Sequence, residues 1–166
     1  MKRVIVIGCP GAGKSTFARK LRDRTGLPLH YLDRLWHKAD KTHIPREEFD
    51  GRLADILTED RWIVDGNYGR TLEMRLRYCD TVFLLDIEPE VCLAGVRSRI
   101  GCEREDMPWI ETELDPEFQQ QIEAFPSHEL PGIYALLDRY RPGREVVIFR
   151  SREETEDYLS GTRFSP

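Results

Sequence analysis

Residues 8–16 bring together residue types that can hold a chain of phosphates. The segment matches the pattern G-x-x-x-x-G-K-[ST], and its residues are Gly8, Cys9, Pro10, Gly11, Ala12, Gly13, Lys14, Ser15 and Thr16. Glycines allow backbone N–H groups to approach a phosphate closely, because no side chain blocks the loop. The lysine can reach the β- and γ-phosphates, and the serine hydroxyl can bind Mg²⁺. The segment therefore predicts binding of ATP with Mg²⁺.

The flanking residues give this motif its expected context. An apolar run, Val4–Ile7, comes directly before it, and a helical pattern with Phe17 and Leu21 follows and ends at Gly26. A helix that begins after the loop points its positive dipole end at the bound phosphate. The alternative is a chance glycine turn with a surface lysine, and the complete match with both flanks disfavours it.

A P-loop site also needs a carboxylate near Mg²⁺, normally at the end of a neighbouring strand. Asp65 follows the apolar run Trp62–Val64, and Asp86 follows the run Thr81–Leu85. We favour Asp65 as the metal-binding residue because Gly66 follows it and permits close backbone approach. Either aspartate could instead simply end its strand.

Polar residues after two predicted strands are candidates for binding the phosphate acceptor. Asp33 could accept the proton of a substrate hydroxyl. Trp36 could stack on a ring or fill the rim of the core. Three further candidates follow Asp65 in one loop: Asn67, Tyr68 and Arg70. Because the carboxyl ends of parallel strands meet at one sheet edge, where ligands bind, we expect these residues near the phosphate loop.

The stretch from Gly101 to Asp115 is the longest without clear periodicity. It predicts a short mobile lid over about residues 97–115. Arginines near Gly101 could stabilise charge on a transferred phosphoryl group once the lid closes, and we assign Arg99 and Arg104 this catalytic role beside Lys14. The alternative for each arginine is an exposed position on a helix face.

The elements that must position these residues alternate along the chain. Short apolar runs predict five strands, at 4–7, 29–32, 62–64, 81–85 and 146–149. Helical patterns separate them, including one that begins with the capping box Ser151–Glu154. The sequence therefore predicts one α/β domain over residues 1–166, a P-loop NTPase sandwich with a five-stranded parallel sheet and helices on both faces.

Composition narrows the class of partner. The 166 residues carry a formal net charge of −5, which argues against long nucleic acids, because these normally require a basic surface. No apolar run approaches the roughly 18 residues that would span a membrane, and Val4–Ile7 is too short for a signal-peptide core. We expect a cytoplasmic protein with a small-molecule acceptor, and the oligomeric state stays open.

The chain resembles the adenylate-kinase-like P-loop kinases and, within them, the group known as DNA topology modulation proteins. Four segments carry the resemblance: Gly8–Thr16, Leu32–Trp36, Trp62–Tyr68 and Arg104–Met107. The resemblance implies a five-stranded parallel sheet with an acceptor region and a lid. The loop Asp65–Thr71 looks like the D-G-F-P-R-T loop of adenylate kinases with one added residue, which implies that Arg70 faces the acceptor and Asp65 the metal. The Phe-Pro pair of that loop is absent, so the acceptor need not be AMP.

These features predict an ATP-dependent kinase that phosphorylates a nucleotide, a nucleoside or another small metabolite. The competing hypothesis is a nucleotide-binding switch that hydrolyses ATP slowly and acts through a protein or DNA partner. Phosphate transfer to an acceptor, measured against the water-only background, distinguishes the two.

Overall fold

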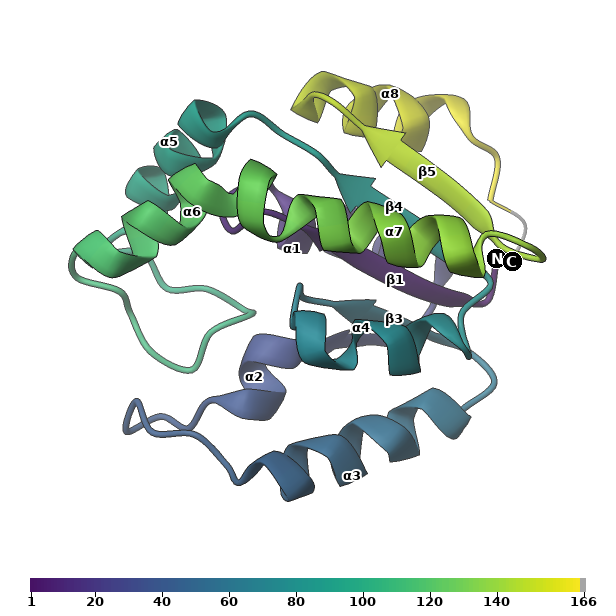
Figure 1. Cartoon of the computed structure of the whole chain (residues 1–166), viewed down its shortest axis with the longest axis horizontal. Helices are drawn as coiled ribbons and strands as arrows, with labels where there is room; N and C mark the ends of the chain where they lie inside the picture. Colours follow the sequence, from purple (N-terminus) through teal and green to yellow (C-terminus); the bar gives the residue numbers. More distant parts are fainter. Residues whose placement is uncertain (165–166) are drawn as a thin grey trace.

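A computed structural model describes residues 1–164, and its centre is one parallel sheet (Figure 1). Its strands are β1 (Arg3–Gly8), β2 (Leu29–Tyr31), β3 (Trp62–Asp65), β4 (Thr81–Leu85) and β5 (Glu145–Phe149). The strands lie in the order β2-β3-β1-β4-β5, and every neighbouring pair is parallel. The prediction of a five-stranded parallel sheet is confirmed.

Burial explains why the central strands read as continuous apolar runs. The side chains of Val4–Ile7 in β1 are 0% exposed, because helices cover both faces of a parallel sheet. In the register, Val6 lies beside Asp65 of β3, and Gly8 lies beside Leu85 of β4. The segment after Gly8, which is predicted to bind phosphate, and the carboxylate of Asp65 therefore leave the sheet at the same edge.

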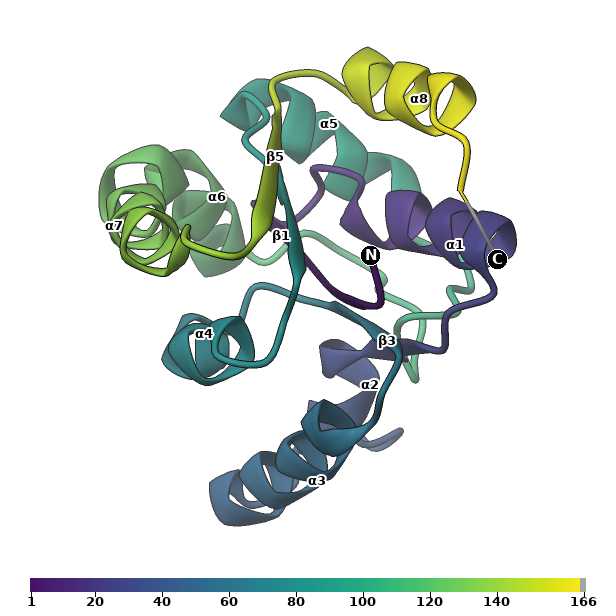
Figure 2. The same ribbon diagram turned by 90° about the vertical axis from the view of Figure 1, so that its right-hand side faces the viewer.

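Helices lie on both faces of the sheet, as predicted. Figure 2 shows the sheet nearly edge-on, with α1 and α8 on one side and α4 and α7 on the other. The helices are α1 (Lys14–Thr25), α2 (Leu32–Trp36), α3 (Arg46–Thr58), α4 (Gly69–Leu76), α5 (Pro89–Arg99), α6 (Pro116–His128), α7 (Leu130–Tyr140) and α8 (Arg152–Gly161).

Two predicted helix boundaries have a clear local cause. Gly26 ends α1 in the left-handed conformation, with φ of 65°, and its N–H donates to the carbonyl of Arg22. The Ser151 hydroxyl accepts from the N–H of Glu154 at the start of α8. In a capping box the Glu154 carboxylate would accept in return from the N–H of Ser151. Here it accepts from the N–H of Arg150 instead, so this second hydrogen bond of the predicted capping box is shifted by one residue.

The strand predicted at Leu29–Leu32 is one residue too long. Leu32 begins the short helix α2, and its side chain is 0% exposed. An apolar residue that is fully buried in a helix gives the same local signal as one in a strand, so the pattern could not separate them. As a consequence, Asp33 lies in the first turn of a helix.

The segment between α5 and α6, residues 100–115, contains turns and bends but no helix or strand. It corresponds to most of the predicted lid. No helix within residues 1–164 is long and apolar enough to cross a membrane.

Candidate functional site: a phosphate loop between two cavities

The loop after β1 needs glycine at two positions for steric reasons. A Cβ atom on Gly8 would lie 2.3 Å from the carbonyl oxygen of Leu85, and one on Gly11 would lie 2.1 Å from that of Cys92. Both glycines also have positive φ, 143° and 82°, a region that other residues rarely adopt. The loop therefore packs tightly against the ends of β4 and α5.

Lys14 begins α1 and folds back over the loop. Its Nζ donates to the carbonyl oxygen of Cys9 at 3.0 Å, and this carbonyl also accepts from the N–H of Ala12 at 3.1 Å. The ammonium group is half-buried at the helix N-terminus, where the backbone N–H groups have no intrahelical partner. The cationic side chain and the helix N-terminus together favour an anion at this position.

Three carboxylates approach the phosphate loop from different elements. Asp65 comes from β3, Asp33 from α2 and Asp106 from the 100–115 segment. Burial raises the pKa of Asp65 to about 6, the charges of Asp33 and Asp106 add to this effect, and Lys14 opposes it. The carboxylates thus repel one another in a dry environment, which is the electrostatic setting that a divalent cation relieves.

Ser15 lies beside this group of carboxylates, and its Oγ donates to Asp106 at 3.1 Å. Asp65 is only 4% exposed, and its Oδ1 has no hydrogen-bond partner. A buried carboxylate oxygen without a donor fits a role as ligand to Mg²⁺ or to its water molecules. Residues 1–164 contain no group of three or more His, Cys, Asp or Glu side chains arranged to hold a metal. A Mg²⁺ ion at this position would therefore need further ligands, such as nucleotide phosphates or water.

Two arginines of the predicted lid already lie over the loop. Arg104 pairs with Asp106 at 2.5 Å and also with Glu111, while Arg99 Nε lies 3.3 Å from the Glu111 carboxylate. Burial alone would raise the pKa of Asp106, but the hydrogen bonds from Arg104 outweigh burial and hold the pKa below its usual value. The ion pairs keep both guanidinium groups close to Lys14 and Ser15, where they can meet phosphate oxygens.

The loop 66–68 carries Tyr68, whose hydroxyl donates to Asp33 at 2.8 Å. Burial raises the pKa of Tyr68, and the neighbouring Asp33 carboxylate adds to the effect, so the phenol stays a donor at neutral pH. Tyr68 has an unusual φ of 27° for a residue other than glycine. The structure around it must hold this conformation in place.

Arg75 of α4 supplies that support. It is 0% exposed and donates to three backbone carbonyls of the loop: Gly66 at 2.8 Å, Asn67 at 2.6 Å and Tyr68 at 3.1 Å. Burial lowers the pKa of Arg75 to about 10, so the guanidinium remains charged at neutral pH. Arg75 is a positioning residue that the sequence did not point to.

Two cavities open on either side of the phosphate loop. The first, of about 310 Å³, lies between the loop, α5 and α8. The second, of about 620 Å³, lies between the loop, the ends of α2 and β3, the 100–115 segment and α6. They share five lining residues: Lys14, Ser15, Arg99, Arg104 and Asp106. The shared wall therefore combines three cationic side chains with the serine hydroxyl and one carboxylate.

Most of the predicted site residues line these cavities. In the loop, residues 11–16 line the first cavity and Pro10 the second, while Gly8 and Cys9 are buried below the surface. The second cavity is also lined by the predicted residues Asp33, Asp65, Asn67 and Tyr68. Asp86, the weaker metal candidate, lines neither cavity and instead pairs with Arg150 and accepts from Tyr134.

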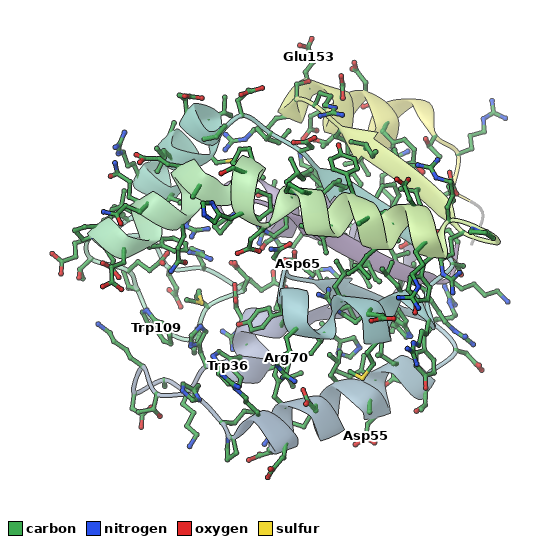
Figure 3. The ribbon with its side chains drawn as sticks, in the orientation of Figure 1. Trp36, Asp55, Asp65, Arg70, Trp109 and Glu153 are labelled. Atoms are coloured by element: carbon green, nitrogen blue, oxygen red, sulfur yellow. The ribbon has the colours of Figure 1, made fainter. Side chains whose placement is uncertain are left out.

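Two predicted acceptor residues, Trp36 and Arg70, line neither cavity. Figure 3 labels both side chains. Arg70 pairs through both terminal nitrogens with Asp50 of α3, at 2.8 and 2.6 Å. Trp36 stacks on His43, with ring centroids 4.3 Å apart and planes 9° apart. In this conformation Trp36 packs at the rim of the core, the alternative that the sequence left open.

Several lining residues were not assigned from the sequence. Asp106 lies in one of the four segments that carry the family resemblance, but we assigned it no role, because it lies in an aperiodic segment and its partner Ser15 is distant in the chain. Arg152 donates to the carbonyl of Gly11 at 2.7 Å and lines the first cavity, but its position at the start of α8 indicated only a helix cap. Aromatic side chains line the second cavity at Trp109, Phe118 and Phe125.

Known proteins with similar sequences and folds include several kinases. No protein-family model matches the chain. An adenylate kinase from Thermotoga neapolitana is 25% identical over 91 residues, which span 54% of this chain and 40% of that protein. The chain thus aligns with less than half of that relative's length.

Among solved structures, the fold is similar to that of deoxyadenosine kinase from M. mycoides, with a TM-score of 0.55 and 10% sequence identity. The alignment covers 95% of this chain and 94% of that kinase. A sugar kinase from Janibacter sp. HTCC2649 gives a TM-score of 0.51 and 19% identity, with 97% and 91% covered. At these identities the likeness shows the fold alone, an α/β fold shared with these two kinases.

Proposed function

We propose that the protein is an ATP-dependent phosphotransferase that transfers the γ-phosphoryl group of ATP to a small molecule. The observation that carries this proposal is the pair of cavities that meet at Lys14, Ser15 and the two arginines. One cavity would hold the nucleotide, the other the acceptor. Their shared wall carries the cationic groups that phosphoryl transfer requires.

The proposed reaction is a direct transfer. An acceptor hydroxyl oxygen attacks the γ-phosphorus, the bond from this phosphorus to the β,γ-bridging oxygen breaks, and ADP leaves with the bond electrons. Asp33 accepts the proton of the attacking hydroxyl, while Tyr68, which donates to Asp33 at 2.8 Å, orients the carboxylate. Lys14, Arg99 and Arg104 stabilise charge on the transferred group.

Ser15 and Asp65 would hold the Mg²⁺ ion, which supplies charge neutralisation at the β- and γ-phosphate oxygens. Asp106, bonded to the Ser15 hydroxyl in this structure, would release it when the ion binds. Closure of residues 97–115 over the site would exclude water and favour transfer over hydrolysis.

We further propose that the protein belongs to the P-loop kinases known as DNA topology modulation proteins, because the four segments described above resemble that group. The name of that group does not imply a nucleic-acid substrate here, because the net charge of −5 disfavours one. We also retain the prediction of a cytoplasmic location.

The test is acceptor-dependent ADP formation with MgATP, measured across nucleosides, nucleoside monophosphates and sugars. We expect at least one class to raise the rate well above the rate with water alone, and Lys14→Ala to remove the increase. Lys20→Ala is a matched control, because Lys20 lies on the same helix but lines neither cavity. If no acceptor raises ADP formation, the kinase proposal fails and the nucleotide-switch hypothesis is favoured.

A further inference from the structure

The charges around the second cavity are strongly asymmetric. Its three cationic side chains are the ones it shares with the first cavity, namely Lys14, Arg99 and Arg104. The rest of its described lining contains no lysine or arginine. That remaining part carries six carboxylates: Asp33, Asp65, Glu111, Glu113, Asp115 and Glu129.

Some of these carboxylates already have a partner or a proposed role. Glu111 pairs with Arg99 and Arg104. Asp115 caps α6 by accepting from the N–H of Glu117. Asp65 would serve Mg²⁺. Three carboxylates are left, and no ion pair joins them to a described lysine or arginine: Asp33, Glu113 and Glu129.

Two of these three carboxylates have neutral hydrogen-bond partners. Asp33 accepts from the Tyr68 hydroxyl at 2.8 Å, and Glu129 accepts from the Asn67 amide at 2.7 Å. Neutral donors satisfy hydrogen bonding but leave the negative charge uncompensated. His37 also lines the cavity, and burial lowers its pKa, so it adds no positive charge at neutral pH.

Two buried acceptor atoms in the same lining also lack a donor. They are Oδ1 of Asp65, whose side chain is more than nine-tenths buried, and Oδ1 of Asn67. A buried acceptor without a partner normally indicates an absent ligand, ion or water. Apart from the Asp65 oxygen that would serve Mg²⁺, the cavity thus offers negative charge and an unused acceptor on Asn67, which suit a ligand that carries hydrogen-bond donors.

An anionic acceptor would meet cationic side chains only on the wall that the two cavities share, where we assign Lys14, Arg99 and Arg104 to the γ-phosphate. A nucleoside monophosphate needs arginine or lysine for its own phosphate, in addition to those that hold the γ-phosphate. Arg70, the residue expected to fill this role, is paired with Asp50 and lies outside the lining. A cavity whose lining carries seven carboxylates and three cationic side chains would instead raise the local concentration of a cation.

We propose that the acceptor is a hydroxyl compound that carries at least one protonated amine, which binds near Glu113 and Glu129 while the hydroxyl group faces Asp33. This inference rests on the proposed kinase function and specifies its substrate class. The cavity volume of about 620 Å³ accommodates a ring-sized molecule. Tyr68, Trp109, Phe118 and Phe125 provide apolar walls for such a ring.

The experiment compares two series of probes that differ in charge. One series is glucosamine, glucose and glucuronate; the other is 5′-amino-5′-deoxyadenosine, adenosine and adenosine 5′-monophosphate. Thermal shifts with Mg²⁺ and a non-hydrolysable ATP analogue report binding, and ADP formation with MgATP reports transfer. We expect the cationic member of at least one series to give the largest thermal shift and the highest kcat/KM.

Charge variants identify the site. Glu113→Gln combined with Glu129→Gln should weaken the cationic probe on the order of 10-fold and leave the neutral probe nearly unchanged. Glu123→Gln, on α6 but outside the cavity lining, should change neither. Equal losses for the cationic and the neutral probe would contradict the proposal.

The proposal is also overturned if adenosine 5′-monophosphate or glucuronate is the best probe, or if no cationic probe exceeds its neutral counterpart in thermal shift. If adenosine 5′-monophosphate or glucuronate is the best probe and phosphate is transferred to it, the kinase function stands and only the proposed substrate class is refuted. Loss of the kinase function itself would be recognised by ADP formation that no probe raises and that Lys14→Ala does not lower.

Discussion

Replacement of the buried Arg75 by methionine should destabilise the protein and loosen the loop 66–68. Methionine has a similar length, so the change removes the hydrogen-bond donors without opening a large cavity. The side chain is 0% exposed, and its donors serve the carbonyls of Gly66, Asn67 and Tyr68. These carbonyls would be left with fewer partners in a dry environment.

The magnitude follows from two opposing effects. Hydrogen bonds from a charged donor contribute roughly 1.5–3 kcal/mol each, so the three together stabilise the fold by roughly 5–9 kcal/mol. Burial of the charge costs free energy, and a pKa lowered to about 10 corresponds to roughly 3 kcal/mol. The expected net loss for Arg75→Met is therefore roughly 2–6 kcal/mol, a large fraction of the stability of an ordinary domain.

Urea unfolding followed by circular dichroism measures this loss, with Arg77→Met as the matched control. Arg77 directly follows α4, and its side chain is exposed and bonds only surface groups, so its replacement should have little effect. Hydrogen exchange should also speed up at the amides of residues 66–70, while ATP still raises the melting temperature. A loss below about 1 kcal/mol, or one equal to that of the control, would refute the positioning role of Arg75.

The remaining predictions concern the metal, the serine hydroxyl and the lid. Burial raises the pKa of Asp65 from 3.8 to about 6, so the folded apoprotein binds this proton more tightly than the unfolded chain and its stability falls as the pH rises through that window. Asp65→Asn should therefore raise the Tm of the apoprotein at pH 7.5 but not at pH 3.5. The same variant should lose Mg²⁺-dependent turnover. A lower Tm at pH 7.5, measured by calorimetry, would contradict the prediction. Ser15→Ala should reduce Mg²⁺-dependent turnover more than metal-free nucleotide binding, and equal losses in the two assays would exclude a metal role for the hydroxyl. Residues 97–115 should exchange amide hydrogens faster without ligand than with an ATP analogue and an acceptor, and unchanged exchange would remove the lid from the mechanism.

The fold and the phosphate loop could be predicted because their causes are local in the sequence. The strand β1, the glycines and the first turn of α1 are consecutive, and each follows from the residue type at its own position. The parallel pairing and the helices on both faces follow from the alternation of strands and helices along the chain, whereas the order of the strands was not predicted.

The acceptor side could be predicted only in part, because its geometry depends on pairs far apart in the chain. Asp33 and Tyr68 are joined by a hydrogen bond across 35 positions, and Ser15 and Asp106 across 91. Arg70 was assigned to the acceptor from its loop position, yet Asp50, which pairs with it, comes from another helix. The buried role of Arg75 was equally hidden, because an arginine on a helix usually indicates an exposed face.

The central claim is that this site transfers the γ-phosphoryl group of ATP to an acceptor molecule. The most direct measurement follows ATP labelled at the γ-phosphate and determines whether the label appears on the acceptor or on inorganic phosphate, in the wild-type protein and in Lys14→Ala. The account predicts label on the acceptor, and a rate in Lys14→Ala that is lower by a factor of about 10² or more with the circular dichroism spectrum unchanged. Label found only on inorganic phosphate with every acceptor, or transfer at a normal rate in Lys14→Ala, would contradict it.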